Sequence, residues 1–114
     1  MNTKIESVAS SFRDAITTVI VPLQTSRNLN PTELARLESL AEEITKLLKG
    51  SDSISKSLLN ELYLTARILK NEAVHSISHR SQLEAASKKL EHYFELILKD
   101  ESPQQRIPGV PRIV

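Results

Sequence analysis

The sequence contains no cysteine and no tryptophan, and only two of its 114 residues are glycine. Without cysteine the chain has no disulfide, no thiolate nucleophile and no thiolate metal site, which favours a protein of the reducing cytoplasm. Phosphate-binding loops need several glycines, so Gly50 and Gly109 cannot build a nucleotide fingerprint or a P-loop. No serine lies in a Gly-x-Ser-x-Gly context. The sequence therefore predicts a non-enzymatic protein without a cofactor.

Neither sign of charge dominates, since 15 basic side chains stand against 14 acidic ones. Such a chain has no overall field that steers it to nucleic acid or to an anionic membrane, so a charged partner must meet a local patch. The longest apolar stretch, residues 16–23, is interrupted by polar residues and a proline. It is far shorter than the roughly 20 residues of a membrane span, and the first residues show no signal peptide pattern. We therefore expect no membrane association.

Apolar residues at three- and four-residue spacing are the main pattern in the sequence, and this spacing is typical of amphipathic helices. The low aromatic content, 4%, also fits helices better than β-sheets. The spacing predicts four helices, over residues 3–21, 31–49, 55–73 and 81–99. Six positions on their apolar faces are predicted to lie in the core: Leu37, Ile44, Leu62, Leu69, Leu90 and Ile97.

Proline sets the predicted end of the first helix. Pro22 has no amide proton and disfavours helical geometry in the preceding residue, so we predict that this helix ends at Val21. The β-branched run of residues 17–21 leaves a strand as the alternative for this segment, although no partner strand is evident.

Capping signals set the other predicted ends. Asn30 followed by Pro31 is a start signal for the second helix, and Gly50 is a stop signal. The run of residues 51–53, Ser-Asp-Ser, offers alternative caps for the third helix. Ser81 opens a capping box for the fourth helix, and an earlier start, three residues before it, remains open.

Short connections between amphipathic helices favour antiparallel neighbours. The predicted fold is therefore an all-α, up-down-up-down four-helix bundle of residues 1–101, with a three-helix core crossed by the first helix as the rival. Residues 102–114 combine prolines with apolar side chains, which predicts an extended proline-containing C-terminal tail. Two roles for this tail stay open, namely a cover over the bundle and a docking element for a partner.

Histidine supplies the most reactive side chains. His75 and His79 are four residues apart, Glu72 precedes them, and His92 lies on the next predicted helix. Imidazole and carboxylate groups can bind a divalent metal together. However, the set lacks the His-Glu-x-x-His pattern, and residues 76–78 predict a loop that separates the two rings. We therefore expect no metal site and interpret the histidines as exposed residues, with a proton-sensing role as the alternative.

The third and fourth predicted helices carry a candidate nucleic-acid patch. It comprises Arg67, Lys70, Arg80, Lys88 and Lys89. Glutamates are interleaved at positions 61, 72, 84, 91 and 95, and no aromatic stacking platform accompanies the basic residues. Ion pairs along a solvated face explain this mixture, so nucleic-acid binding is the second hypothesis and not the first.

The second predicted helix is acidic on its solvent side, a feature that could meet a basic partner. Glu42 and Glu43 are adjacent, so their side chains diverge by about 100° on a helix and cannot form a catalytic dyad. We instead predict that they contact a protein. The predicted partner-binding residues are Glu38, Glu42, Glu43, His79, Arg80 and, in the tail, Arg112.

Three segments of the second half of the chain carry a family resemblance. They are residues 58–67 (Leu-Leu-Asn-Glu-Leu-Tyr-Leu-Thr-Ala-Arg), 93–98 and 106–114. They resemble small helical immunity proteins of bacterial toxin–immunity systems, above all those of the contact-dependent growth inhibition type. The resemblance implies a cytoplasmic protein that binds one cognate toxin domain and blocks its active site or the approach of its substrate.

The sequence thus predicts a binding protein that acts as an immunity protein or antitoxin. Immunity proteins against basic nucleases are often strongly acidic, whereas this chain is nearly neutral, which leaves a nuclease target open. The alternatives are a nucleic-acid-associated helical regulatory module and a structural helical oligomer.

Overall fold

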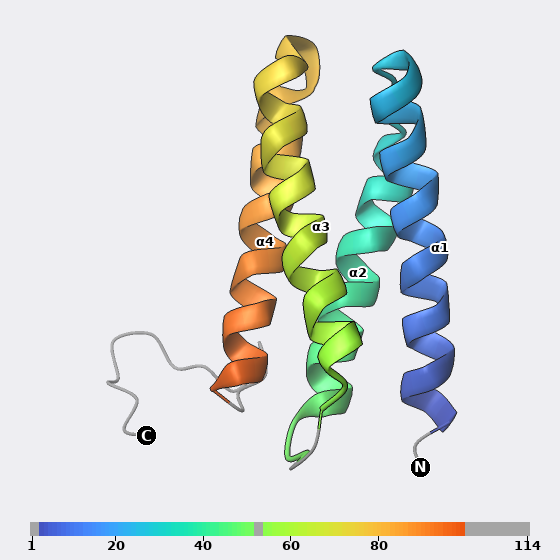
Figure 1. Cartoon of the computed structure of the whole chain (residues 1–114), viewed down its shortest axis with the longest axis vertical. Helices are drawn as coiled ribbons and strands as arrows, with labels where there is room; N and C mark the ends of the chain where they lie inside the picture. The colour runs from blue at the N-terminus through green and yellow to red at the C-terminus, as the bar shows by residue number, and fades with distance from the viewer. Residues whose placement is uncertain (1–2, 52–53, 100–114) are drawn as a thin grey trace.

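The computed structural model describes residues 3–51 and 54–99. These residues form four long helices and one short 3-10 helix: α1 (Thr3–Ser26), α2 (Pro31–Leu48), α3 (Lys56–His75), η1 (Ile77–His79) and α4 (Arg80–Leu98). The long helices run alternately up and down the molecule (Figure 1). The predicted all-α four-helix bundle is confirmed, whereas the predicted tail, residues 102–114, lies outside the described residues.

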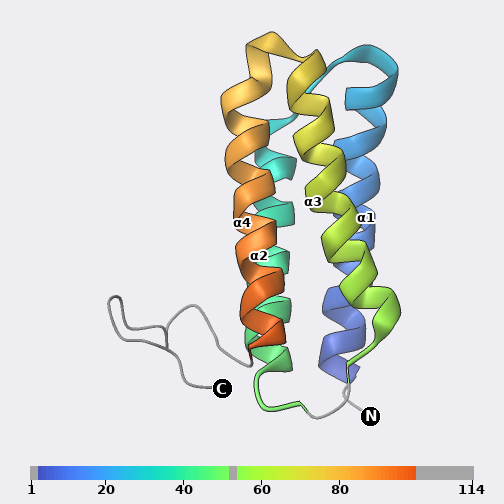
Figure 2. The same cartoon turned by 60° about the vertical axis from the view of Figure 1, so that its left-hand side comes forward.

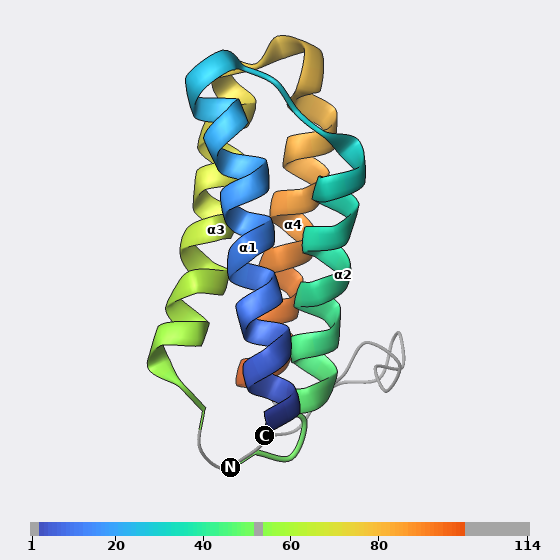
Figure 3. The same ribbon diagram turned by 90° about the vertical axis from the view of Figure 1, so that its right-hand side faces the viewer.

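The helices surround the core in the order α1, α2, α4, α3. Figure 3 shows α1 in front, with α2 and α3 at its sides and α4 behind it. Two antiparallel hairpins, α1 with α2 and α3 with α4, therefore pack side by side. The consecutive helices α2 and α3 lie diagonally opposite, in contrast to the expectation that short connections join neighbours. Residues 49–55 are enough to reach across the bundle, because an extended chain of this length spans about 20 Å.

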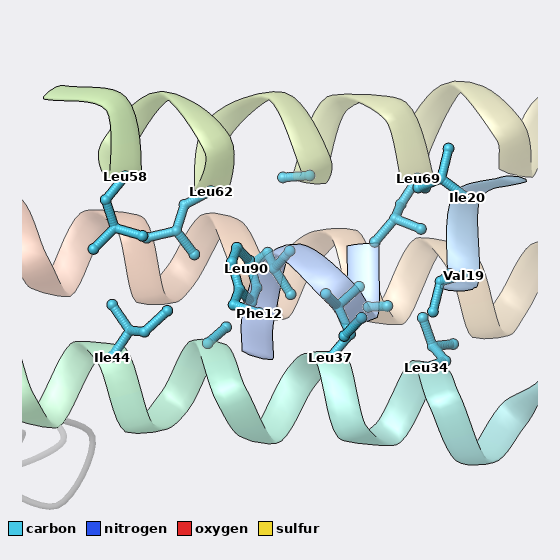
Figure 4. Close-up of a cluster of buried hydrophobic side chains, with 14 of the residues drawn as sticks. Phe12, Val19, Ile20, Leu34, Leu37, Ile44, Leu58, Leu62, Leu69 and Leu90 are labelled. Carbon is cyan, nitrogen blue, oxygen red and sulfur yellow. The ribbon is translucent and has the colours of Figure 1, made fainter. Parts of the chain in front are cut away.

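Each helix turns one apolar stripe toward the core, and all six predicted core positions are buried. Figure 4 shows leucines of α2 and α3 pointing toward each other around Phe12 of α1, which is fully buried. The first helix is therefore an equal member of the bundle, and the rival three-helix core is wrong. The buried Ser87 hydroxyl of α4 donates to the Ala66 carbonyl of α3 at 2.8 Å, so this buried polar group has a hydrogen-bond partner.

The predicted end of the first helix is wrong, because α1 continues through Pro22 to Ser26. Proline removes one backbone hydrogen bond of the helix. Leu23 follows it and is fully buried, and burial of a leucine stabilises the fold by about 1.5–3 kcal/mol, enough to offset much of the loss. Arg27 then closes the helix in the left-handed conformation, φ 56°, and its amide donates to the Leu23 carbonyl at 3.2 Å.

The strand alternative for residues 17–21 is wrong as well, since this run is helical. The hydroxyls of Thr17 and Thr18 donate to carbonyls one turn earlier, at 3.3 and 2.9 Å. Val19 and Ile20 are buried against the other helices. Packing of this face outweighs the weak preference of β-branched residues for strands.

The other helix ends follow the predictions in part. Asn30 caps α2 as predicted, with its side chain accepting from the amides of Thr32 and Glu33 at 3.0 and 3.3 Å. Gly50 closes the same helix with a φ of 84°. The α3 helix is capped by Ser55, which accepts from the Leu58 amide at 3.3 Å, and not by the earlier run of serines.

The predicted capping box at Ser81 is wrong. The α4 helix begins one residue earlier, directly after η1, and its N-cap residue His79 makes no capping hydrogen bond through its side chain. The side chain of Arg80 instead stabilises the connection between α3 and α4. Its Nε donates to the Ala73 carbonyl at 3.1 Å and its Nη2 donates to the Val74 carbonyl at 3.2 Å, so one side chain satisfies the last carbonyls of α3.

In the part of the chain that the structure describes, no helix combines the length and apolarity of a membrane span.

Candidate binding surface

The acidic residues on α2 all lie beside basic side chains of the protein itself. Glu38 Oε1 is 3.2 Å from Lys89 Nζ, an ion pair that joins α2 to α4. The Glu42 carboxylate lies 3.8 Å from Lys46 Nζ on the same helix. Three of the six predicted partner-binding residues are therefore on one helix, as expected. Their charges are largely compensated: the remaining pairs on this side are Glu43 with Lys4 at 4.0 Å and Glu33 with Arg36 at 3.5 Å.

The seam between α2 and α4 also shifts two protonation equilibria. The hydrogen bond and the negative charge of Glu38 raise the pKa of Lys89 above its ordinary value. Burial raises the pKa of the neighbouring Tyr93 phenol, and the negative charge of Glu42 adds to this effect. Both groups therefore stay protonated to higher pH than in the unfolded chain.

The other predicted partner-binding residues lie away from these glutamates. His79 and Arg80 are at the start of α4, at the upper end of the bundle, whereas Glu42 and Glu43 lie toward the lower end of α2 (Figure 2). Arg80 is occupied with the carbonyls at the end of α3. Arg112 lies outside the described residues. The described members of the predicted set therefore do not form one continuous surface.

The residues of the metal hypothesis are also separated. Glu72 is paired at 2.8 Å with Arg27, which directly follows α1, and the His92 ring lies beside that of Tyr93, with 6.1 Å between centroids. Among residues 3–51 and 54–99, no three histidine or acidic side chains come close enough to hold a metal ion.

The five basic residues of the nucleic-acid hypothesis do not act together. Lys89 and Arg80 are engaged as described above. Lys70 and Lys88 line a small hollow between α3 and α4 together with Glu84 and Glu91, so positive and negative side chains alternate there. Mixed charge of this kind does not form the uninterrupted basic stripe that phosphate contacts need.

The solvent side of α3 differs from that of α2 because it carries exposed apolar side chains. Tyr63, Leu64 and Val74 expose 43%, 45% and 63% of their surface, and Ile77, just after the helix, exposes 85%. Their spacing places the α3 members on one outward side, together with the exposed Arg67. We refer to Tyr63, Leu64, Arg67 and Val74 as the α3 face.

Aromatic contacts hold the centre of the α3 face in place. The Arg67 guanidinium lies 5.7 Å from the centroid of the Tyr63 ring, and its Nη1 donates to the Tyr63 hydroxyl at 3.2 Å. The Tyr63 ring in turn packs against Phe94 of α4, with 5.8 Å between centroids and 43° between ring planes. These contacts reduce the rotational freedom of both exposed side chains before any partner binds.

Two ion pairs fix α3 against α1 beside the α3 face. Arg13 Nε lies 2.7 Å from Glu61 Oε2, and Arg27 Nη1 lies 2.8 Å from Glu72 Oε1. The hydrogen bond to Glu61 raises the pKa of the Arg13 guanidinium. A shallow apolar hollow of about 300 Å³, which includes Leu64 in its lining, lies along this seam. Both glutamates of α3 are thus engaged by arginines across this seam, and the Glu61 pair adjoins Leu64 in the hollow.

Sequence reasoning missed the α3 face because it searched for charge and for catalytic side chains. Two signals were present in the sequence. Tyr63 and Arg67 are four residues apart, the spacing of neighbours on a helix surface, and the polar side of this helix contains leucine and valine where charged residues are usual.

The comparisons with known proteins add no relative. No protein-family model matches the chain, and no curated protein or solved structure matches it.

Proposed function

We propose that the protein is a non-enzymatic, cytoplasmic binding protein that neutralises a cognate bacterial toxin domain, as an immunity protein or antitoxin. The α3 face is the observation that supports this proposal. Tyr63, Leu64, Arg67 and Val74 lie exposed on a helix whose opposite side is fully packed. Tyr63 and Leu64 are adjacent, Val74 is exposed on the same side of the helix, and a partner that covers this side would remove their apolar surface from water.

The composition of the α3 face fits protein recognition. Tyrosine and arginine are enriched among the residues that dominate binding energy at protein interfaces. Tyr63 and Arg67 also belong to residues 58–67, the segment that resembles immunity proteins. A face on a regular helix is already ordered, so little conformational entropy is lost on binding. This favours the high affinity that inhibition of a toxin requires.

Growth protection tests this proposal. The toxin domain encoded by a neighbouring gene is expressed in a sensitive host with and without this protein, and the complex is isolated by size-exclusion chromatography. We expect the protein to restore growth and to co-elute with the toxin domain. Leu64→Asp should abolish protection, whereas Ser39→Asp, which introduces the same carboxylate at an exposed position of α2, should retain it.

Failure of the protein to protect or to form the complex would contradict the immunity role. Salt-sensitive retention on DNA or RNA would instead support the nucleic-acid-associated module, because phosphate contacts weaken steeply as salt rises.

A further inference from the structure

Among the described residues, no carboxylate forms an ion pair with the positive charge of the α3 face. The only acidic residues of α3 are Glu61 and Glu72, which are paired with Arg13 of α1 and with Arg27, directly after α1. On the solvent side of α3 the charged residues are Lys56, Arg67 and Lys70, all basic and exposed. On α2, by contrast, Arg36 and Lys46 are each paired with a glutamate of the same helix.

Contact with Tyr63 positions the Arg67 guanidinium and leaves most of its N–H groups available to an anionic group. Within the described part of the chain, its hydrogen-bond partner is the neutral Tyr63 hydroxyl, and no carboxylate lies within ion-pair distance. A guanidinium carries five N–H donors, so most of its donors remain open. Because Tyr63 already restricts its position, Arg67 can bind a carboxylate with two parallel hydrogen bonds at little entropic cost.

We propose that the α3 face binds a protein surface, helical at the contact, that presents a carboxylate surrounded by apolar side chains. Arg67 receives the carboxylate, and Leu64 and Val74 on either side of it are covered by the apolar residues of the partner. This inference rests on the proposed function and specifies the surface of the toxin domain that is recognised. Leu64 and Val74 are separated by about 15 Å along the helix axis, which matches about three turns of a partner helix.

The apolar residues favour a protein over a nucleic acid as the partner. A phosphate could also pair with Arg67, but it would leave Leu64 and Val74 uncovered. Nucleic-acid binding also draws on several cations along the backbone, and the nearby Lys70 and Lys88 are interleaved with Glu84 and Glu91. The combination of one positioned cation with flanking apolar groups fits a protein interface better.

Designed peptides test the chemistry of this surface without the toxin. The ¹⁵N-labelled full chain is titrated with an amphipathic peptide of about 18 residues whose apolar side consists of leucines around one central glutamate. A matched peptide with lysine in place of glutamate and a short single-stranded DNA serve as the other probes. We expect the leucine–glutamate peptide to shift the amide resonances of Tyr63, Arg67 and Val74, and to bind about fivefold more tightly than the lysine peptide.

Substitution of Arg67 separates charge recognition from apolar contact. Arg67→Ala should weaken binding of the leucine–glutamate peptide about fivefold. Arg36→Ala, which removes an exposed arginine from α2, should leave it unchanged. Thermal melts of both variants check that the fold is retained.

Several results would overturn the inference. They are equal binding of the two peptides, equal binding by the Arg67→Ala variant, resonance shifts confined to the seam between α1 and α3 or absent, and stronger shifts of the α3 face with DNA. Growth protection is measured without these peptides. Protected cells together with any of these results would therefore retain the immunity role and reject this surface.

Discussion

The solvent sides of α2 and α3 differ although the helices are similar in other respects. They contain 18 and 20 residues, and both bury a leucine-rich stripe. On α2 the solvent side is occupied by ion pairs within the helix and with its neighbours, whereas α3 exposes Tyr63, Leu64 and Val74 around one arginine. A count of charges identifies α2 as the candidate surface, but charges already paired on the protein surface contribute little binding energy to a partner. Exposed apolar side chains and an arginine without a described carboxylate partner are found on α3.

Both helices are packed into the core by fully buried leucines, and truncation of one leucine on each helix tests whether this packing contributes equally to stability. Leu37 of α2 and Leu69 of α3 are fully buried. Leu37→Ala and Leu69→Ala should each lower the free energy of unfolding by about 2–5 kcal/mol, because each removes buried methyl groups and leaves a cavity. Urea denaturation followed by circular dichroism measures both values. A stability equal to that of the wild type for either variant would show that its helix is not packed as described.

Much of the fold could be predicted from the sequence because helix periodicity reports directly on burial. All six predicted core residues are buried, and the caps at Asn30 and Gly50 have the expected geometry. The end of α1 could not be predicted. Pro22 is a local signal, and it is overridden by the burial of Leu23, which depends on helices that are distant in sequence.

The candidate site was less predictable, since it depends on which charges find partners. The sequence contains Glu38 and Lys89 but does not show that these residues, 51 positions apart, form an ion pair. Likewise, Glu61 and Glu72 are paired with Arg13 and Arg27, so no carboxylate of the described residues pairs with Arg67, and this could be seen only once the helix order was known. Periodicity identifies the buried side of a helix but not the neighbours of its exposed side.

Truncation of Tyr63 tests the α3 side of the comparison. Tyr63→Ala removes the ring that supports Arg67 and contacts Phe94, so the affinity for the toxin domain should fall at least about tenfold, with a loss of stability of about 1 kcal/mol. Tyr63→Phe keeps the ring and should retain most of the affinity. Lys46→Ala on α2 is the control and should change affinity by less than about twofold. Isothermal titration calorimetry with the purified toxin domain provides these values, and similar losses for Tyr63→Ala and Lys46→Ala would remove the distinction between the two helices.

Removal of an ion pair tests the α2 side. From the sequence alone, reversal of Glu42 and Glu43 is predicted to slow association and to make it less dependent on salt, since exposed charges steer encounter. Because both carboxylates are beside lysines of the protein itself, we now expect that removal of a whole pair without a change in net charge, Glu42→Gln/Lys46→Gln, leaves the association rate within about twofold of the wild-type rate, with a stability loss of about 0.5 kcal/mol. Stopped-flow kinetics at two salt concentrations measures this rate. A severalfold slower association at low salt would return α2 to the interface.

The smallest expected effect is a pH dependence of the free energy of unfolding, which comes from Lys89 and Tyr93 between α2 and α4 and not from the α3 face. The pKa values of Lys89 and Tyr93 are raised in the folded protein above their ordinary values of 10.5 and 10.0. A raised pKa means that the folded state binds the proton more tightly, so this contribution to stability is complete below the ordinary pKa and is lost as the pH rises through the folded pKa. The free energy of unfolding should therefore decline above about pH 10 in the wild type, and decline less in Lys89→Gln/Tyr93→Phe. Arg67→Ala should decline like the wild type, because Arg67 contacts Tyr63 of its own helix and not Lys89 or Tyr93. Urea unfolding at closely spaced pH values gives the slopes, and equal slopes for the wild type and the double variant would show that the seam between α2 and α4 is not the source of the dependence.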